Sequence, residues 1–125
     1  MQFRQYGNVE IDVDKMGIDM LSLSGHKIYG PKGVGALYVR KGIEFEKFMN
    51  GGGQEKNKRA GTENVAGIVG LGKACELSNR NLKNHIQKVK ALRDYLLDRL
   101  THEFPNIKIN GRLAKRLPRQ SKCFI

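Results

Sequence analysis

The chain has 125 residues, of which 39% are hydrophobic, and a formal net charge of +11. Its length allows at most one ordinary domain, and no apolar stretch approaches the roughly 20 residues of a membrane span. The start of the chain lacks the apolar core of a signal peptide, and Cys75 and Cys123 form no Cys-x-x-Cys pair. We therefore expect a cytoplasmic protein without a membrane span, a metal site or a disulfide framework.

Two apolar runs frame a glycine-rich turn in the first third of the chain. Residues 19–24 and 35–40 each have the length and composition of a strand. Before them, residues 9–13 alternate between apolar and acidic side chains, as a half-buried strand or an extended segment would. The turn residues between the two runs are Gly30, Pro31, Gly33 and Gly35. Lys27 is therefore predicted to lie where the first strand ends and the backbone turns sharply.

The four residues Ser24-Gly25-His26-Lys27 suggest Schiff-base chemistry. A lysine amine condenses with an aldehyde when its neutral form becomes accessible, and Gly25 has no side chain to block a flat ring. The Ser24 hydroxyl and the His26 ring N–H suit phosphate oxygens. Pyridoxal phosphate, a phosphorylated aldehyde cofactor, would use all of these groups. Four common residues in a glycine-rich hairpin also occur without any ligand, so this motif alone leaves both interpretations open.

The next stretch is predicted to contain a short amphipathic element, residues 43–49, and then a glycine-rich loop, residues 50–62. Three successive glycines favour a mobile or tightly wound loop. Its basic residues precede Gly61 and Thr62 at the start of a helix, a combination that suits an anion pocket. A flexible linker is the other interpretation of the same composition.

Two helices are predicted in the second half. Thr62 can cap a helix to about Leu77, and Asn81 can cap a second helix that ends before Pro105. Three glycines in the first helix indicate close packing against another element, and Cys75 falls on its apolar stripe as a small core residue. The glycines are Gly67, Gly70 and Gly72, and the two histidines of the second helix, His85 and His102, are predicted to be surface residues without a catalytic role.

Two short strands, at 107–109 and 123–125, are predicted around a basic loop at the end of the chain. Residues 80–125 contain twelve Lys or Arg and three Asp or Glu. Such asymmetry suits either a solvated basic face, which we favour, or a surface for nucleic acid or an acidic partner. No aromatic platform or nucleic-acid motif accompanies the charge.

The run from Ser24 to Tyr38 resembles the cofactor-lysine segment of the class V aminotransferase family of pyridoxal-phosphate enzymes. Within that family it is most similar to the cysteine desulfurases of iron–sulfur assembly, and Gly51 to Thr62 resembles their dimer-crossing loop. The resemblance covers residues 7–125 and implies a central fragment of an α/β, fold-type I pyridoxal-phosphate transferase. Residues 1–79 would end the cofactor-binding large domain, and residues 80–125 would form the linking long helix and the start of the small α+β domain.

The resemblance also implies an activity and its residues. The complete enzyme would convert L-cysteine to L-alanine and an enzyme-bound persulfide, with an iron–sulfur scaffold protein as acceptor and no membrane or nucleic-acid partner. Lys27 would hold pyridoxal phosphate and move protons, Ser24 and His26 would bind its phosphate, and Thr62 would reach the cofactor of the other subunit in a homodimer.

The chain also departs from the family pattern. Met1 and Arg4 stand where the family has ring-contacting Asp and Gln residues, and Cys123 does not match the mobile sulfur-carrying cysteine. We therefore expect this chain alone to be inactive. Two further interpretations are a non-catalytic basic fragment that binds an acidic protein or RNA, and a remnant that does not fold alone.

Overall fold

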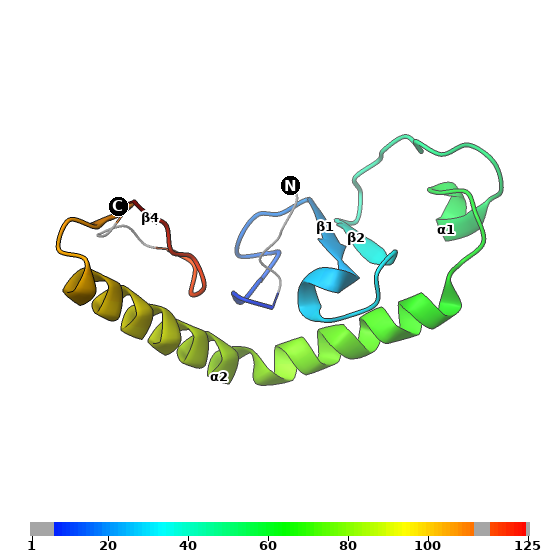
Figure 1. Cartoon of the computed structure of the whole chain (residues 1–125). Helices are drawn as coiled ribbons and strands as arrows, with labels where there is room; N and C mark the ends of the chain where they lie inside the picture. Colours follow the sequence, from blue (N-terminus) through cyan, green and yellow to red (C-terminus); the bar gives the residue numbers. More distant parts are fainter. Residues whose placement is uncertain (1–6, 112–115, 125) are drawn as a thin grey trace.

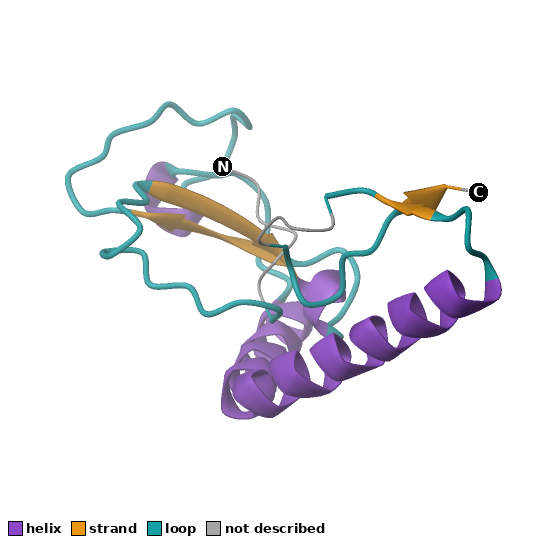
Figure 2. Cartoon of the chain, turned by 90° about the vertical axis from the view of Figure 1, so that its left-hand side faces the viewer, coloured by secondary structure: helices purple, strands orange, loops and turns teal. Residues whose placement is uncertain are grey.

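The computed structural model describes residues 7–111 and 116–124, so the interpretations of Met1, Arg4 and Ile125 lie outside the described residues. A small hairpin and a short second hairpin both lie on the same side of one long, bent helix (Figure 1). Figure 2 shows the same arrangement turned by 90°. The elements in chain order are β1 (Met20–Ser24), the 3-10 helix η1 (Gly25–Ile28), β2 (Gly35–Val39), α1 (Gln54–Asn57), α2 (Val65–Glu103), β3 (Lys108–Ile109) and β4 (Cys123–Phe124).

The two strands predicted around the glycine-rich turn are confirmed as β1 and β2. They pair antiparallel, with Met20 opposite Val39 at one end and Ser24 opposite Gly35 at the other. A Cβ atom at Gly35 would lie 2.5 Å from the carbonyl oxygen of Leu23, so only glycine lets the strands approach this closely at the turn.

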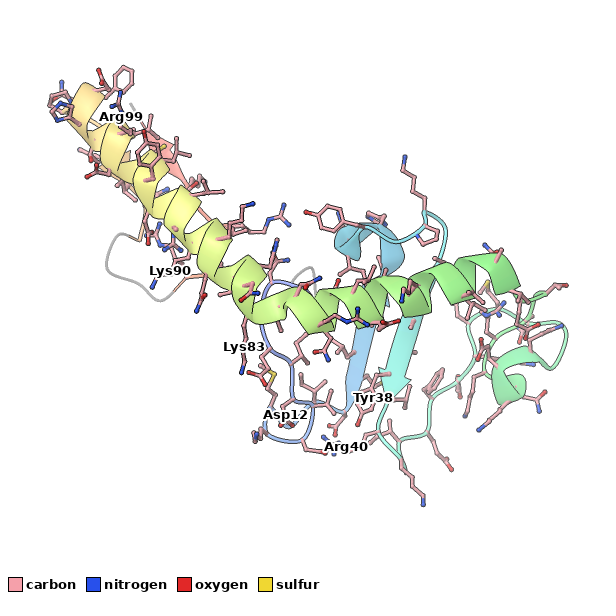
Figure 3. The ribbon with its side chains drawn as sticks, turned by 90° about the horizontal axis from the view of Figure 1, so that it is seen from below. Asp12, Tyr38, Arg40, Lys83, Lys90 and Arg99 are labelled. Atoms are coloured by element: carbon pink, nitrogen blue, oxygen red, sulfur yellow. The ribbon has the colours of Figure 1, made fainter. Side chains whose placement is uncertain are left out.

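Arg40, at the open end of this hairpin, connects it by hydrogen bonds to residues 13–19, which precede β1. Its guanidinium donates hydrogen bonds to the carboxylates of Asp14, at 2.7 Å, and Asp19, at 3.0 Å, and to the carbonyl oxygens of Val13 and Ile18, both at 3.0 Å. The hydrogen bond that Arg40 donates to the Asp14 carboxylate is the main reason that the pKa of Arg40 is raised above its usual value. Arg40 and Asp12 lie at the same end of the hairpin (Figure 3).

The structure contains one helix where two were predicted. α2 runs through Asn81 for 39 residues, bends near its middle (Figure 1) and ends before Pro105 as expected. The predicted break fails because residues 78–81 contain no glycine or proline to interrupt the hydrogen-bonding pattern. The predicted cap is also wrong, because the side chain of Asn64, not that of Thr62, accepts a hydrogen bond from the Gly67 N–H at 3.0 Å.

The first half of α2 packs against the turn that follows β1. Ile28, Leu71 and Ala74 form a buried cluster, against which Leu23, Val34 and Cys75 pack, so the prediction of Cys75 as a core residue is confirmed. The prediction that glycines of the helix allow close packing is confirmed at Gly70, whose position faces Pro31. It is wrong at Gly72, where a Cβ atom would meet nothing within 4 Å.

The second half of α2 carries the second hairpin. The predicted short strands are confirmed as β3 and β4, with Ile109 opposite Cys123 in an antiparallel pair. Arg93 links this region to the helix, since its side chain donates a hydrogen bond to the carbonyl of Leu117 at 3.2 Å. Arg116 donates hydrogen bonds to the carbonyls of Asn110 and Gly111, at the end of β3.

Two other predictions are settled by the backbone. Residues 9–13 are an extended segment with turns rather than a strand, and residues 43–49 form no helix or strand. Phe48 is 97% exposed whereas Phe45 is half-buried, so the apolar side chains of this segment do not share one buried face.

Within the described ranges, no helix is long and apolar enough to cross a membrane, and no cluster of metal-binding side chains is present.

Candidate functional site

Lys27 lies in η1, on a turn that backbone hydrogen bonds close from both sides. The carbonyl of Gly25 accepts from the N–H groups of Tyr29 and Gly30, the latter at 2.9 Å, and the N–H of Gly25 donates to Val34 at 2.9 Å. Tyr29 ends the turn with a left-handed φ of 63°, an uncommon conformation for a residue with a side chain. The turn therefore presents residues 26 and 27 from a tightly fixed backbone, as the sequence predicted for Lys27.

The role that we assigned to Gly25 is corrected by the structure. Gly25 is buried, and a Cβ atom there would lie 2.8 Å from the carbonyl oxygen of Pro31 and 3.1 Å from Val34 Cγ1. The chain itself occupies that space, so it is not open for a flat ring. Glycine is required here because the two sides of the turn approach each other closely.

The side chains of Ser24, His26 and Lys27 project from β1 and η1 and have no hydrogen-bond or ion-pair partner in the described part of the chain. Ser24 is half-buried, and His26 and Lys27 are exposed. Among residues 7–111 and 116–124, none of the three side chains makes a hydrogen bond or ion pair, and Ser24 does not cap η1. A hydroxyl, an imidazole and an ammonium group with no bound carboxylate fit an anionic, aldehyde-bearing group such as pyridoxal phosphate.

Thr62 is not brought to these three residues. It is exposed in the loop before α2, whereas η1 packs beside Ala74. From the start of the helix at Val65 to Ala74, the rise of 1.5 Å per residue gives a separation of roughly 14 Å along the axis. Thr62 therefore cannot complete a site with the Lys27 of its own chain in this structure.

Two of the basic residues before Thr62, namely Lys58 and Arg59, make contacts with neighbouring groups of this chain. Arg59 donates hydrogen bonds to the carbonyls of Ala60 and Gly61, both at 2.9 Å. Lys58 lies over the ring of Phe45, 4.9 Å from its centre. The anion pocket that the sequence suggested for this loop is therefore not assembled by these side chains.

A pocket that sequence reasoning missed lies between η1 and α2. Its volume is about 280 Å³, and His85 lines it as a half-buried residue, which corrects the prediction that His85 is at the surface. The helix contributes Ala74, Ser78, Asn81 and His85, at spacings of three to four residues that share one face. That spacing was the available signal, although only the fold places Lys27 and Asn8 across from it.

Comparisons with known proteins agree on one family. The profile described as "Aminotransferase class-V" matches residues 4–124. Cysteine desulfurase IscS of Dictyoglomus turgidum is 49% identical over 112 residues, which are 90% of this chain and 28% of that protein. Cysteine desulfurase IscS of Clostridium botulinum (strain Hall) is 51% identical over 114 residues, again 90% of this chain and 29% of that protein.

Solved structures give the same result. A NifS-like protein from Rickettsia africae superposes with a TM-score of 0.85 at 37% identity, over 90% of this chain and 31% of that one. DndA from Streptomyces lividans gives a TM-score of 0.77 at 38% identity, over 90% of this chain and 33% of that one. The chain therefore spans less than a third of the length of the curated relatives it matches.

Proposed function

This chain belongs to the class V aminotransferase family, and we propose that it forms the cofactor-lysine portion of a cysteine desulfurase. The predicted fold class, a fragment of an α/β, fold-type I pyridoxal-phosphate transferase, is confirmed by the likeness to the NifS-like structures. The reaction proposed for the complete enzyme converts L-cysteine to L-alanine and leaves the sulfur on the enzyme as a persulfide. An iron–sulfur scaffold protein in the cytoplasm would accept that sulfur.

One observation carries the proposal, namely the unpartnered donor set on the turn that holds Lys27. The Nζ atom of Lys27 would anchor pyridoxal phosphate and move protons during the reaction, while His26 and Ser24 would donate hydrogen bonds to the phosphate oxygens. When bound, the cofactor supplies an electron sink for the bonds broken at the substrate's α-carbon. The backbone hydrogen bonds at Gly25 keep the three side chains on one rigid turn.

The separation of Thr62 from Lys27 supports a homodimer in which Thr62 serves the partner's cofactor. We also propose that residues 1–79 belong to the cofactor-binding domain and residues 80–125 to the start of a second, smaller domain. The packing of η1 on one half of α2, and the anchoring of the second hairpin by Arg93 on the other half, support this division.

The alternative, a basic fragment for an acidic protein or RNA, is less well supported. Four basic residues of α2 lie in ion pairs along the helix itself, in the pairs Lys73–Glu76, Arg80–Glu76, Arg93–Asp94 and Arg99–Glu103. The pairs formed by Lys73, Arg80 and Arg99 are exposed on both sides, as is typical of a solvated helix face.

The test is whether the protein releases alanine and sulfide from L-cysteine in equal amounts once pyridoxal phosphate and a thiol reductant are supplied. The complete enzyme should do so, and the Lys27→Ala variant should not. Alanine formation that survives the loss of Lys27 would contradict the assignment. The 125-residue chain alone is expected to be inactive.

A further inference from the structure

The pocket between η1 and α2 contains a buried polar side chain without a partner. Asn8 lines the pocket, is only 5% exposed, and makes no hydrogen bond through its side chain within residues 7–111 and 116–124. No fully buried side-chain nitrogen or oxygen in the described part of the chain lacks a hydrogen-bond partner, so the unpaired amide atoms of Asn8 reach the open pocket rather than the packed interior. The pocket beside Asn8 is the place from which such a partner can come.

The wall that carries Asn8 is closely fitted to η1. Gly7 has a φ of +82°, a conformation that favours glycine, and a Cβ atom there would lie 3.1 Å from Ile28 Cγ2. Figure 1 shows this first described segment beside η1, above the bend of α2. Asn8 is thus held against the pocket by the close fit of the preceding residue.

The other lining groups define the chemistry of a ligand. Ser78, Asn81 and His85 present a hydroxyl, an amide and an imidazole, and Lys27 and Arg119 add positive charge. No Asp or Glu is among the lining residues. Apolar side chains, those of Ile28, Ala74 and Leu77, form another part of the wall. The pocket therefore combines donors and cations with an apolar surface.

We propose that this pocket binds a small carboxylate ion with a short hydrocarbon tail. The carboxylate would accept hydrogen bonds from the amides of Asn8 and Asn81, with the cations nearby, and the tail would cover the side chains of Leu77 and Ala74. Free phosphate would leave that apolar wall exposed, and a neutral alcohol would not use the positive charge. Lys27 lines this pocket and is also the proposed cofactor lysine, so its charge is available here only while no cofactor is bound. The contacts from Asn8 and Asn81 do not involve the cofactor, so the inference is tested separately from the desulfurase assignment.

The test compares three probes of related size, namely butanoate, 1-butanol and inorganic phosphate, added without pyridoxal phosphate. Their effect on the amide NMR signals of Asn8, Ser78 and Asn81 is followed in the protein, with circular dichroism to confirm that the helix is present. Butanoate should shift these signals in a saturable way. Equal affinity for butanol or phosphate, or no saturation by butanoate in a folded sample, would overturn the proposal.

A matched pair of variants on α2 tests the geometry. Asn81→Leu removes an amide that lines the pocket, and Asn84→Leu makes the same change at an exposed position three residues on, outside the lining. Loss of a hydrogen bond to a charged group should weaken butanoate binding about tenfold in Asn81→Leu and leave it unchanged in Asn84→Leu. Equal weakening by both variants would overturn the proposal. Asn8→Leu removes the other amide proposed to contact the carboxylate, so butanoate binding should also weaken in this variant.

Discussion

A Cβ atom added to Gly70 would lie 2.7 Å from Cγ of Pro31, which places α2 directly against the loop that closes the Lys27 turn. The two residues are 39 positions apart, and their contact lies beside the buried cluster of Ile28, Leu71 and Ala74. The long helix and the proposed cofactor turn are therefore a single packed unit, and changes on the helix should be felt at the turn.

The substitution Gly70→Ala is expected to destabilise the fold. Alanine is intrinsically better in a helix by about 1 kcal/mol, but its methyl group would press on a proline ring that cannot rotate away. Overpacking of this kind typically costs about 1–3 kcal/mol. Chemical denaturation should therefore show a net loss of unfolding free energy.

The control is Gly72→Ala on the same helix, where the new methyl group meets nothing within 4 Å. Only the gain in helix propensity applies there, so stability should rise by up to about 1 kcal/mol. A loss of stability in both variants, or in neither, would contradict the contact between α2 and the loop.

Arg40 should be more important for stability than its neighbour Lys41. Arg40→Lys keeps the positive charge but cannot reproduce the forked hydrogen bonds to Asp14, Asp19 and the two carbonyls, so the thermal unfolding midpoint should fall. Lys41→Ala, at an exposed position without a partner in the described part of the chain, should leave the midpoint unchanged. Equal midpoints for both variants would show that the Arg40 hydrogen bonds contribute nothing measurable.

Asp12 should titrate below its usual value near 3.8, because a hydrogen bond from the backbone N–H of Lys15, followed by its ammonium group, lowers the pKa of this carboxyl. A folded-state pKa below the unfolded one means that Asp12 stabilises the fold above pH 3.8. That contribution is lost as the pH falls through the lowered pKa. NMR titration of the Asp12 carboxyl carbon measures the value directly, and a midpoint at or above 3.8 would contradict the geometry of this turn.

The proposed exchange of Thr62 between subunits can be tested with hybrid dimers of the complete enzyme. A dimer of one Lys27→Ala subunit and one Thr62→Ala subunit contains one site with both defects and one intact site, if Thr62 acts across the interface. Its activity should be about half that of the wild type, because one of two independent sites remains. Activity at half the level of the Thr62→Ala homodimer would instead place Thr62 in the same site as its own Lys27.

Local patterns predicted much of this fold. The apolar runs and turn residues gave the positions of β1, β2 and the Lys27 turn, and the leucine spacing gave the second half of α2. Residues 43–49 were predicted wrongly because their apolar side chains share no buried face, since Phe45 is half-buried and Phe48 is exposed.

The remaining features depend on contacts between distant residues. The hydrogen bonds from Arg40 to Asp14 and Asp19, the burial of Asn8 and the role of Gly25 all arise where separate segments meet, and no single window of sequence contains them. The helix cap was ambiguous for a different, local reason. Thr62 and Asn64 are two residues apart and both can cap a helix, so the sequence alone did not show that Asn64 does so.

The most direct measurement is to add pyridoxal phosphate, reduce with borohydride and locate the modified lysine by peptide mass spectrometry. The modification should lie on Lys27, and the absorbance band of the lysine-linked cofactor should be absent in Lys27→Ala. The band should persist in Lys32→Ala, a change to an exposed lysine of the same loop. Modification of Lys32 instead, or an unchanged band in Lys27→Ala, would contradict the assignment of Lys27 as the cofactor-binding residue.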